Sequence, residues 1–173
     1  MKENTHRFIV TLLVVVPFLS TVLAMTLLWK RMFFAEDLIL LGVFYVLTGI
    51  GVTVGYHRML THQSFEAPSW LRGLLLMLGC MAFEGPPVNW ASTHIKHHAH
   101  SDTEEDPHSP LAGFWYAHLG WLFVMRDYAE EERTYGAHLL EDKVVMFVDR
   151  FAPLWMIASI ILPGLIGGWS GLL

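Results

Sequence analysis

Histidines are concentrated in one part of this chain, where seven of the ten lie between residues 57 and 108. Five of them form two short motifs: HRMLTH, with His57 and His62, and HIKHH, with His94, His97 and His98. On an α-helix, residues three and four apart share one face, so His94 can converge with either partner in its motif. His97 and His98 point about a third of a turn apart, which favours two neighbouring metal ions over one. The five-residue spacing of the first motif is poor for one ion on a straight α-helix, and it suits two ions or a bent helix end.

The residue types restrict the choice of metal. Imidazole is a good ligand for Zn, Cu, Fe and Ni. Structural zinc sites often include cysteine, but Cys80 is the only cysteine in the sequence, and the zinc-protease motif HExxH is absent. Many imidazoles with few carboxylates, beside apolar segments, indicate non-haem iron that activates oxygen and an apolar substrate that enters from the membrane. We expect no catalytic residue beyond the metal ligands.

Other polar residues near the two motifs are expected to support the ligands. His100, His108 and Asp106 are predicted to hydrogen-bond to the ligands rather than to bind metal themselves. The remaining histidines, His6, His118 and His138, have no partner at a ligand spacing and are interpreted as structural or surface residues. A His-rich loop that is merely solvated is the alternative, and five histidines at these spacings argue against it.

The segments around the motifs predict a membrane protein. Hydrophobic residues make up 54% of the 173, and the mean hydropathy is +0.44. Uncharged or nearly uncharged runs at 8–29, 38–56 and 151–166 are long enough to span a bilayer as helices. The net charge of −5 provides no basic field, so nucleic acid is not an expected partner. We therefore predict an all-α, multi-span membrane protein in which residues 57–143 form a helical cap that carries the histidine motifs.

The charges near the N-terminus predict the orientation of this protein. Two spans return the chain to its starting side, so the N-terminus and the cap share one face of the membrane. Lys2 and Arg7 make that face cytoplasmic by the positive-inside rule. A cleaved signal peptide ending at Ala24 is the alternative interpretation, but the apolar run continues past that residue.

The segments GYHRMLTHQSF, NWASTHIKHHAHSDTEEDPHSP and AHLGWLF together resemble the membrane fatty-acid desaturases of the stearoyl desaturase type, which act on acyl-CoA or acyl-lipid substrates. That family has the motifs HRxxxH and HRxHH, then a segment ending in DPH, then a GW pair, in this order. The resemblance runs from about Arg31 to Gly168. It implies that two iron ions, held as a di-iron centre by the five histidines of the two motifs and by others, introduce a cis double bond into a saturated acyl chain.

The sequence also departs from the family pattern. The third motif, HNxHH, is absent, so residues 1–173 are expected to be one partial, N-terminal portion of the domain that does not desaturate by itself. Ile95 replaces an arginine of the second motif, and Thr93 stands where animal acyl-CoA desaturases have aspartate. Arg126 is the only cation close to the GW pair, so it is the candidate for binding an acyl carrier, which is CoA, a carrier protein or a lipid. Trp90 matches a family tryptophan beside the acyl channel, and a membrane-interface aromatic is the alternative.

No flavin, haem or NAD motif is found in the sequence, so an external electron donor of the ferredoxin, cytochrome b5 or flavoprotein reductase type is expected. Two other functions are compatible with the same motifs. One is a membrane hydroxylase or ketolase, and the other is a membrane protein that binds metal without turnover.

Overall fold

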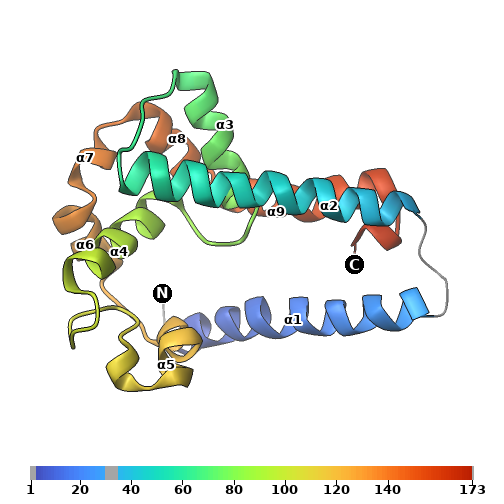
Figure 1. Ribbon diagram of the computed structural model, residues 1–173, viewed down its shortest axis with the longest axis horizontal. Helices are drawn as coiled ribbons and strands as arrows, with labels where there is room; N and C mark the ends of the chain where they lie inside the picture. The colour runs from blue at the N-terminus through green and yellow to red at the C-terminus, as the bar shows by residue number, and fades with distance from the viewer. Residues whose placement is uncertain (1–2, 30–34, 173) are drawn as a thin grey trace.

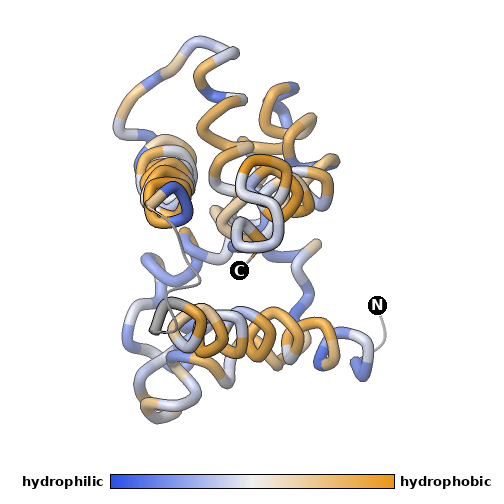
Figure 2. The backbone as a smooth tube through the Cα atoms, turned by 90° about the vertical axis from the view of Figure 1, so that its right-hand side faces the viewer, coloured by the Kyte–Doolittle hydropathy of each residue, from blue (hydrophilic) through white to orange (hydrophobic). Residues whose placement is uncertain are grey.

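A computed structural model describes residues 3–29 and 35–172, and within these ranges the chain is helical and has no strand (Figure 1). Two of the long helices, α2 and α9, lie side by side, α1 runs apart from them, and the shorter helices gather at one end. Figure 2 shows that the long helices are apolar along most of their length. Lys2, which contributed to the predicted orientation, lies outside the described residues.

Among the described residues, two helices are long and apolar enough to cross a membrane, namely Glu3–Leu27 and Ala35–Thr61. The first is part of α1 (Glu3–Trp29) and the second combines α2 (Ala35–Ile50) with η1 (Gly51–Thr61). Helices α8 (Lys143–Arg150) and α9 (Ala152–Gly167) are bent by 60° relative to each other and can form a third span together. All three predicted apolar runs therefore lie in these helices, and the protein is a helical membrane protein.

The second long helix changes its hydrogen-bonding period where it approaches the cap. α2 continues directly into η1, which is a π-helix. Gly51 and Gly55 of this segment face α3 (Ser69–Cys80), and a Cβ atom on Gly51 would overlap the backbone of Gly79. Gly49, two residues earlier in α2, has open space around it. The glycines of η1 therefore allow a close approach between two backbones, and α3 holds the π-helix along one side.

The core of the cap is formed by η1, α3, α4 (Pro87–His100) and α8. Tyr56 and Leu76 are completely buried there, together with Val88 of α4 and Val145 of α8. The hydroxyl of Tyr56 donates a hydrogen bond of 2.9 Å to the carbonyl oxygen of Gly85, just before α4 begins. Burying each of these large side chains contributes about 1.5–3 kcal/mol, so the core fixes α4 firmly against the end of the π-helix.

Helix α4 starts where its sequence predicts a helix start. Pro87 occupies the first turn, where its missing N–H costs no hydrogen bond. The free N–H of Val88 donates to a carboxylate oxygen of Asp149, 2.9 Å away on α8. A negative charge at a helix N-terminus is favourable because it faces the positive end of the helix dipole. Asp149 thus fixes the beginning of the helix that carries the second histidine motif.

The rest of the cap is formed by short elements that follow α4. They are η2 (Pro110–Ala112), α5 (Phe114–His118), η3 (Gly120–Phe123), α6 (Tyr128–Tyr135) and α7 (Ala137–Leu140), and η4 (Ser170–Leu172) ends the described chain. α6 packs along α4. The ring of His6, near the start of α1, lies 2.9 Å from the carbonyl oxygen of Leu122. His6 is buried, as expected for a structural residue, whereas His118 and His138 are exposed.

Candidate metal centre

The two histidine motifs converge at one point. His57, His62, His94 and His98 each place a ring nitrogen within 4.8 Å of the others. Within the first motif the two Nε2 atoms are 3.0 Å apart, and the Nε2 atoms of His94 and His98 are 3.2 Å apart. The expected convergence of imidazoles from the two motifs is therefore confirmed. We call these four residues the four-histidine group.

The π-helix explains how both histidines of the first motif reach the four-histidine group. Hydrogen bonds in a π-helix join residues five apart, so residues with this spacing lie above one another. The backbone N–H of His62 donates to the carbonyl oxygen of His57 at 3.0 Å, and both rings reach the same group. The expectation that this spacing suits two ions or a bent helix end assumed an α-helical period, which this segment does not have. How many ions the pair serves stays a prediction. The second motif reaches the same point with an α-helix and a spacing of four.

His97 belongs to a second group, with Asp106 and His108. The rings of His97 and His108 are stacked, with centroids 4.2 Å apart, and Nδ1 of His97 lies 2.9 Å from a carboxylate oxygen of Asp106. This separation of His97 from His98 follows from the third of a turn between them. Asp106 and His108, predicted to support the ligands, thus lie within ligand distance of His97. We call these three residues the His97 group.

Asp106 organises the loop that follows α4. Its carboxylate accepts hydrogen bonds from the backbone N–H groups of Asp102, at 3.2 Å, and His108, at 3.1 Å. Burial alone would raise the pKa of this carboxyl, but the hydrogen bonds from His97 and from the backbone lower it overall. The DPH segment therefore returns the chain onto α4 around one buried carboxylate.

The surroundings of the four-histidine group favour the neutral form of its two members on α4, His94 and His98. Burial, together with the neighbouring His98 and His57, lowers the pKa of His94 to about 4. Burial also lowers the pKa of His98, with a contribution from His62. Neutral imidazole is the form that binds metal, so these nitrogens are available at neutral pH. The ring of Trp90 stacks on that of His94, with centroids 4.6 Å apart, which places Trp90 directly beside this group.

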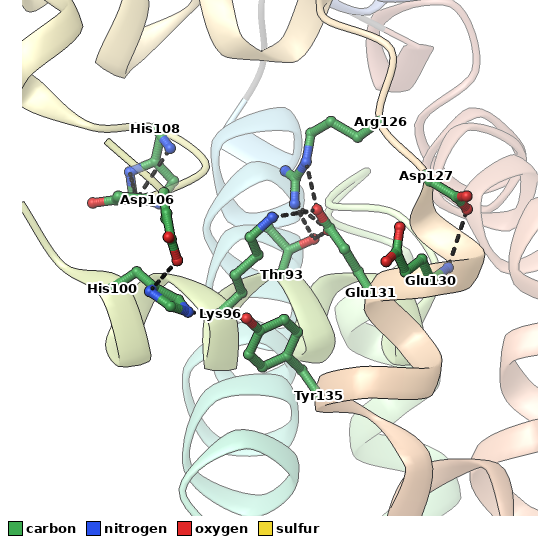
Figure 3. Close-up of polar contacts among 11 residues, drawn as sticks. Thr93, Lys96, His100, Asp106, His108, Arg126, Asp127, Glu130, Glu131 and Tyr135 are labelled. Atoms are coloured by element: carbon green, nitrogen blue, oxygen red, sulfur yellow. Dashed lines mark hydrogen bonds and ion pairs between the residues drawn. The ribbon is translucent and has the colours of Figure 1, made fainter. Parts of the chain in front are cut away.

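Two other predicted residues, His100 and Arg126, pair with side chains outside both groups (Figure 3). The Nε2 atom of His100 is 3.0 Å from the hydroxyl of Tyr135, and its Nδ1 atom is 2.9 Å from the Glu105 carboxylate. Arg126 forms an ion pair with Glu131 of α6. The sequence reasoning had missed Glu131, which is buried and has no histidine nearby in the sequence to indicate a role.

The fold and the site define the class of helical membrane proteins with two adjacent histidine-containing groups that could hold metal ions. The comparison with family models identifies the family within this class. Residues 37–173 match the model described as fatty acid desaturase. The chain belongs to the fatty acid desaturase family, which is a family of oxidoreductases.

Curated relatives agree with this family and differ in the substrates for which they are named. The chain is 38% identical over 128 residues to an sn-1 stearoyl-lipid 9-desaturase of Anabaena variabilis, a match that covers 74% of the chain and 47% of the relative. It is 33% identical over 166 residues to a hex-5-enoyl-[acyl-carrier protein] acetylenase of Moorena producens, covering 89% and 51%. It is 36% identical over 134 residues to a probable acyl-CoA desaturase of Schizosaccharomyces pombe, covering 77% and 28%. The chain thus spans about half the length, or less, of these relatives.

Proposed function

We propose that this protein introduces a cis double bond into a saturated fatty acyl chain, with oxygen, at a di-iron centre to which the histidines described above contribute. The observation that carries the proposal is the convergence of HRMLTH and HIKHH on one point beside a second group of ligands. Membership of the desaturase family supports the same reaction.

The donor atoms fit iron. The four-histidine group offers four imidazole nitrogens, and the His97 group offers two imidazoles and a carboxylate. Imidazole and carboxylate ligands without thiolate are typical of non-haem iron, although imidazole also suits zinc and copper. We propose that the first group holds one ion and that His97 contributes to the second. Bound iron would supply the oxygen activation needed to remove hydrogens from an unactivated acyl chain.

Asp106 is proposed to orient His97. If Nδ1 of His97 carries the proton and donates it to Asp106 at 2.9 Å, the lone pair of Nε2 remains free for a metal. Two backbone N–H groups hold the Asp106 carboxylate in place, so the ring of His97 is fixed as well. His108 stacks on that ring, and its role is either ligand or packing partner.

The acyl chain is proposed to enter from the membrane and to pass Trp90, whose indole ring covers one face of His94. The apolar helices would cross the membrane several times, with the histidine groups on the cytoplasmic side. An external electron donor would supply the reducing equivalents, as expected from the sequence. The chain's own contribution is to exclude water and to position the substrate carbon beside the metal ligands.

A second candidate is the formation of an acetylenic bond. One relative is named as an acetylenase, and its match covers 89% of this chain. Hydroxylation is a third possible outcome of the same hydrogen removal. The products of the three reactions differ in mass and in retention, so one measurement separates them.

The test is product analysis after expression from the full open reading frame, in a bacterial host supplied with a ferredoxin and its reductase. Mass spectrometry of the membrane fatty acids is expected to show a new cis-monounsaturated acid. The His98→Ala variant is expected to abolish this product, whereas His138→Ala, at an exposed histidine outside both groups, should retain it. A hydroxylated or acetylenic product would reject desaturation, and an active His98→Ala variant would reject the proposed ligand set.

A further inference from the structure

The contacts of Arg126 indicate which kind of acyl carrier this site can bind. The names of the relatives include lipid, carrier protein and CoA as carriers. The Nε atom of Arg126 donates to a carboxylate oxygen of Glu131 at 3.0 Å, and its Nη2 atom pairs with the other oxygen and lies 3.4 Å from the hydroxyl of Thr93 (Figure 3). The carboxylate of Glu131 occupies the Nε–Nη2 edge of Arg126, so a phosphate cannot pair with that edge in the bidentate manner.

The rest of the guanidinium is covered. Its central carbon lies 5.8 Å from the ring centroid of Trp121 and 5.5 Å from that of Tyr128. The Nη1 atom is buried and makes no hydrogen bond within the described residues. The Arg126 side chain as a whole is only 11% exposed. The carboxylate and the aromatic rings together thus hold Arg126 as part of the packed cap rather than as an open anion receptor.

Glu131 also forms an ion pair with a second cation, Lys96. The ammonium group of Lys96 donates to Glu131 at 3.1 Å, and the Glu131 side chain is 9% exposed. Lys96 lies on α4 between His94 and His97, so this carboxylate sits directly behind the second histidine motif. One carboxylate thus partners both cations at this place.

A negatively charged pocket of about 420 Å³ is lined in part by Lys96, Arg126 and Glu131. Its lining holds two cations against four carboxylates, a net charge of −2, together with the hydroxyl groups of Tyr116, Thr134 and Tyr135. The carboxylates are Asp106, Asp127, Glu130 and Glu131. A phosphate brought into this pocket would meet like charges, whereas the hydroxyl groups of an uncharged ligand would find hydrogen-bond acceptors. The pocket adjoins the His97 group through Asp106, so a carrier bound in it would lie close to the metal ligands.

We infer that Glu131 determines carrier specificity, because its carboxylate occupies the place on Arg126 and Lys96 that a phosphate would take. The pocket then selects an uncharged, hydroxyl-bearing acyl head group, such as that of a glycosylated glycerolipid, over a phosphate-bearing carrier such as CoA. This inference rests on the proposed function, since it assigns the carrier of the acyl chain on which the reaction acts.

The test is binding of coenzyme A to the purified protein in detergent at low salt, by isothermal titration calorimetry. Wild type is expected to show no saturable binding below about 1 mM. Glu131→Gln keeps the shape of the side chain and releases both cations, so it should bind coenzyme A at least tenfold more tightly, with an affinity that falls as salt increases. Glu141→Gln makes the same charge change at an exposed acid that does not line the pocket and should behave as wild type. The double variant Glu131→Gln, Arg126→Gln should lose the gain.

Three results would overturn the inference. They are saturable, salt-dependent binding of coenzyme A to wild type in the micromolar range, an equal gain in Glu141→Gln, and a folded Glu131→Gln variant without any gain. If Glu131→Gln does not fold, the wild-type measurement still tests the inference, because tight binding of coenzyme A to wild type would show that Glu131 does not keep phosphate away from Arg126 and Lys96. Wild type should also bind octyl β-galactoside in preference to coenzyme A, as measured by ligand-observed NMR. These assays need neither iron nor turnover, so their failure is distinguishable from failure of the desaturation assay.

Discussion

The Nδ1 atom of His97 lies 2.9 Å from a carboxylate oxygen of Asp106, and no part of the Asp106 side chain is exposed to solvent. The same carboxylate accepts two backbone hydrogen bonds from the loop after α4. One buried carboxylate therefore connects the shape of the DPH loop to the orientation of an imidazole in the second histidine motif.

Replacing Asp106 by Asn should weaken metal binding at the His97 group. The amide keeps the size of the side chain but removes the charge that favours the Nδ1-protonated ring, and losses at such positions are typically about 10–100-fold in metal affinity. Titration of the purified protein with Co²⁺, followed by visible absorption, measures this loss. Glu104→Gln, at an exposed acid of the same loop, serves as the control. Equal affinities for wild type and Asp106→Asn would show that this carboxylate does not orient a ligand.

Removing one member of the four-histidine group should reduce bound metal more than removing a histidine elsewhere. His62→Ala leaves three imidazoles around the point of convergence, so the remaining site has lower chelate stability. Iron content after reconstitution and gel filtration, measured by mass spectrometry, should fall by about one ion per chain relative to wild type. His138→Ala should leave the iron content unchanged. If both variants retain the same iron, the four histidines do not form a site.

Glu132 should make the cap less stable as pH rises. Burial raises the pKa of Glu132, and the nearby charge of Asp149 raises it further, against a hydrogen bond with Asn89 that lowers it. A carboxyl with a raised pKa in the folded state favours the fold when protonated, and this contribution is lost as pH rises from about the ordinary value of 4.5 through the folded-state pKa.

Glu132→Gln removes that titration, so its unfolding temperature relative to wild type should increase between pH 4 and pH 7. Thermal unfolding in detergent, followed by circular dichroism, measures the difference at both pH values. Glu130→Gln, at the exposed position two residues earlier, should show no such trend. A relative unfolding temperature that decreases over this range would contradict the assigned sign.

Gly51→Ala should destabilise the contact between the π-helix and α3. The added Cβ atom would overlap the backbone of Leu78 and Gly79, and relief of such overpacking costs about 1–3 kcal/mol. Gly49→Ala is the matched control, because nothing lies within 4 Å of the added atom and alanine favours the helix. Unfolding in detergent should separate the two variants. Equal stability of both would show that the close packing at Gly51 is absent from the protein.

Much of this fold could be predicted from the sequence because its signals are local. The apolar runs of α1, α2 and α9 are long and nearly free of charge, so their helices follow from composition alone. The spacing of His94 and His98 likewise predicts a shared face, since it matches the ordinary α-helical period.

The remaining features depend on contacts that the local pattern does not encode. The π-helical period of Gly51–Thr61 has no distinct periodic signal, so the sequence named His57 and His62 as ligands but did not predict the helix type that brings their rings together. The pairing of Arg126 and Lys96 with Glu131 joins residues up to 35 positions apart. It arises from the packing of α6 on α4, which only the folded chain shows.

The π-helix also determines how the cap is rotated about the axis of α2. An α-helix turns about 100° per residue, so an element that follows a segment of different period leaves it in a different direction. Deleting one residue between His57 and His62 would give the four-residue spacing of the second motif and could preserve the pair on an α-helix. Everything downstream would nevertheless be rotated relative to α2, and α3 would no longer meet Gly51. The π-helical segment therefore sets two directions at the end of an otherwise α-helical span. It turns His57 and His62 toward the histidines of α4, and it directs the following chain so that α3 packs against Gly51.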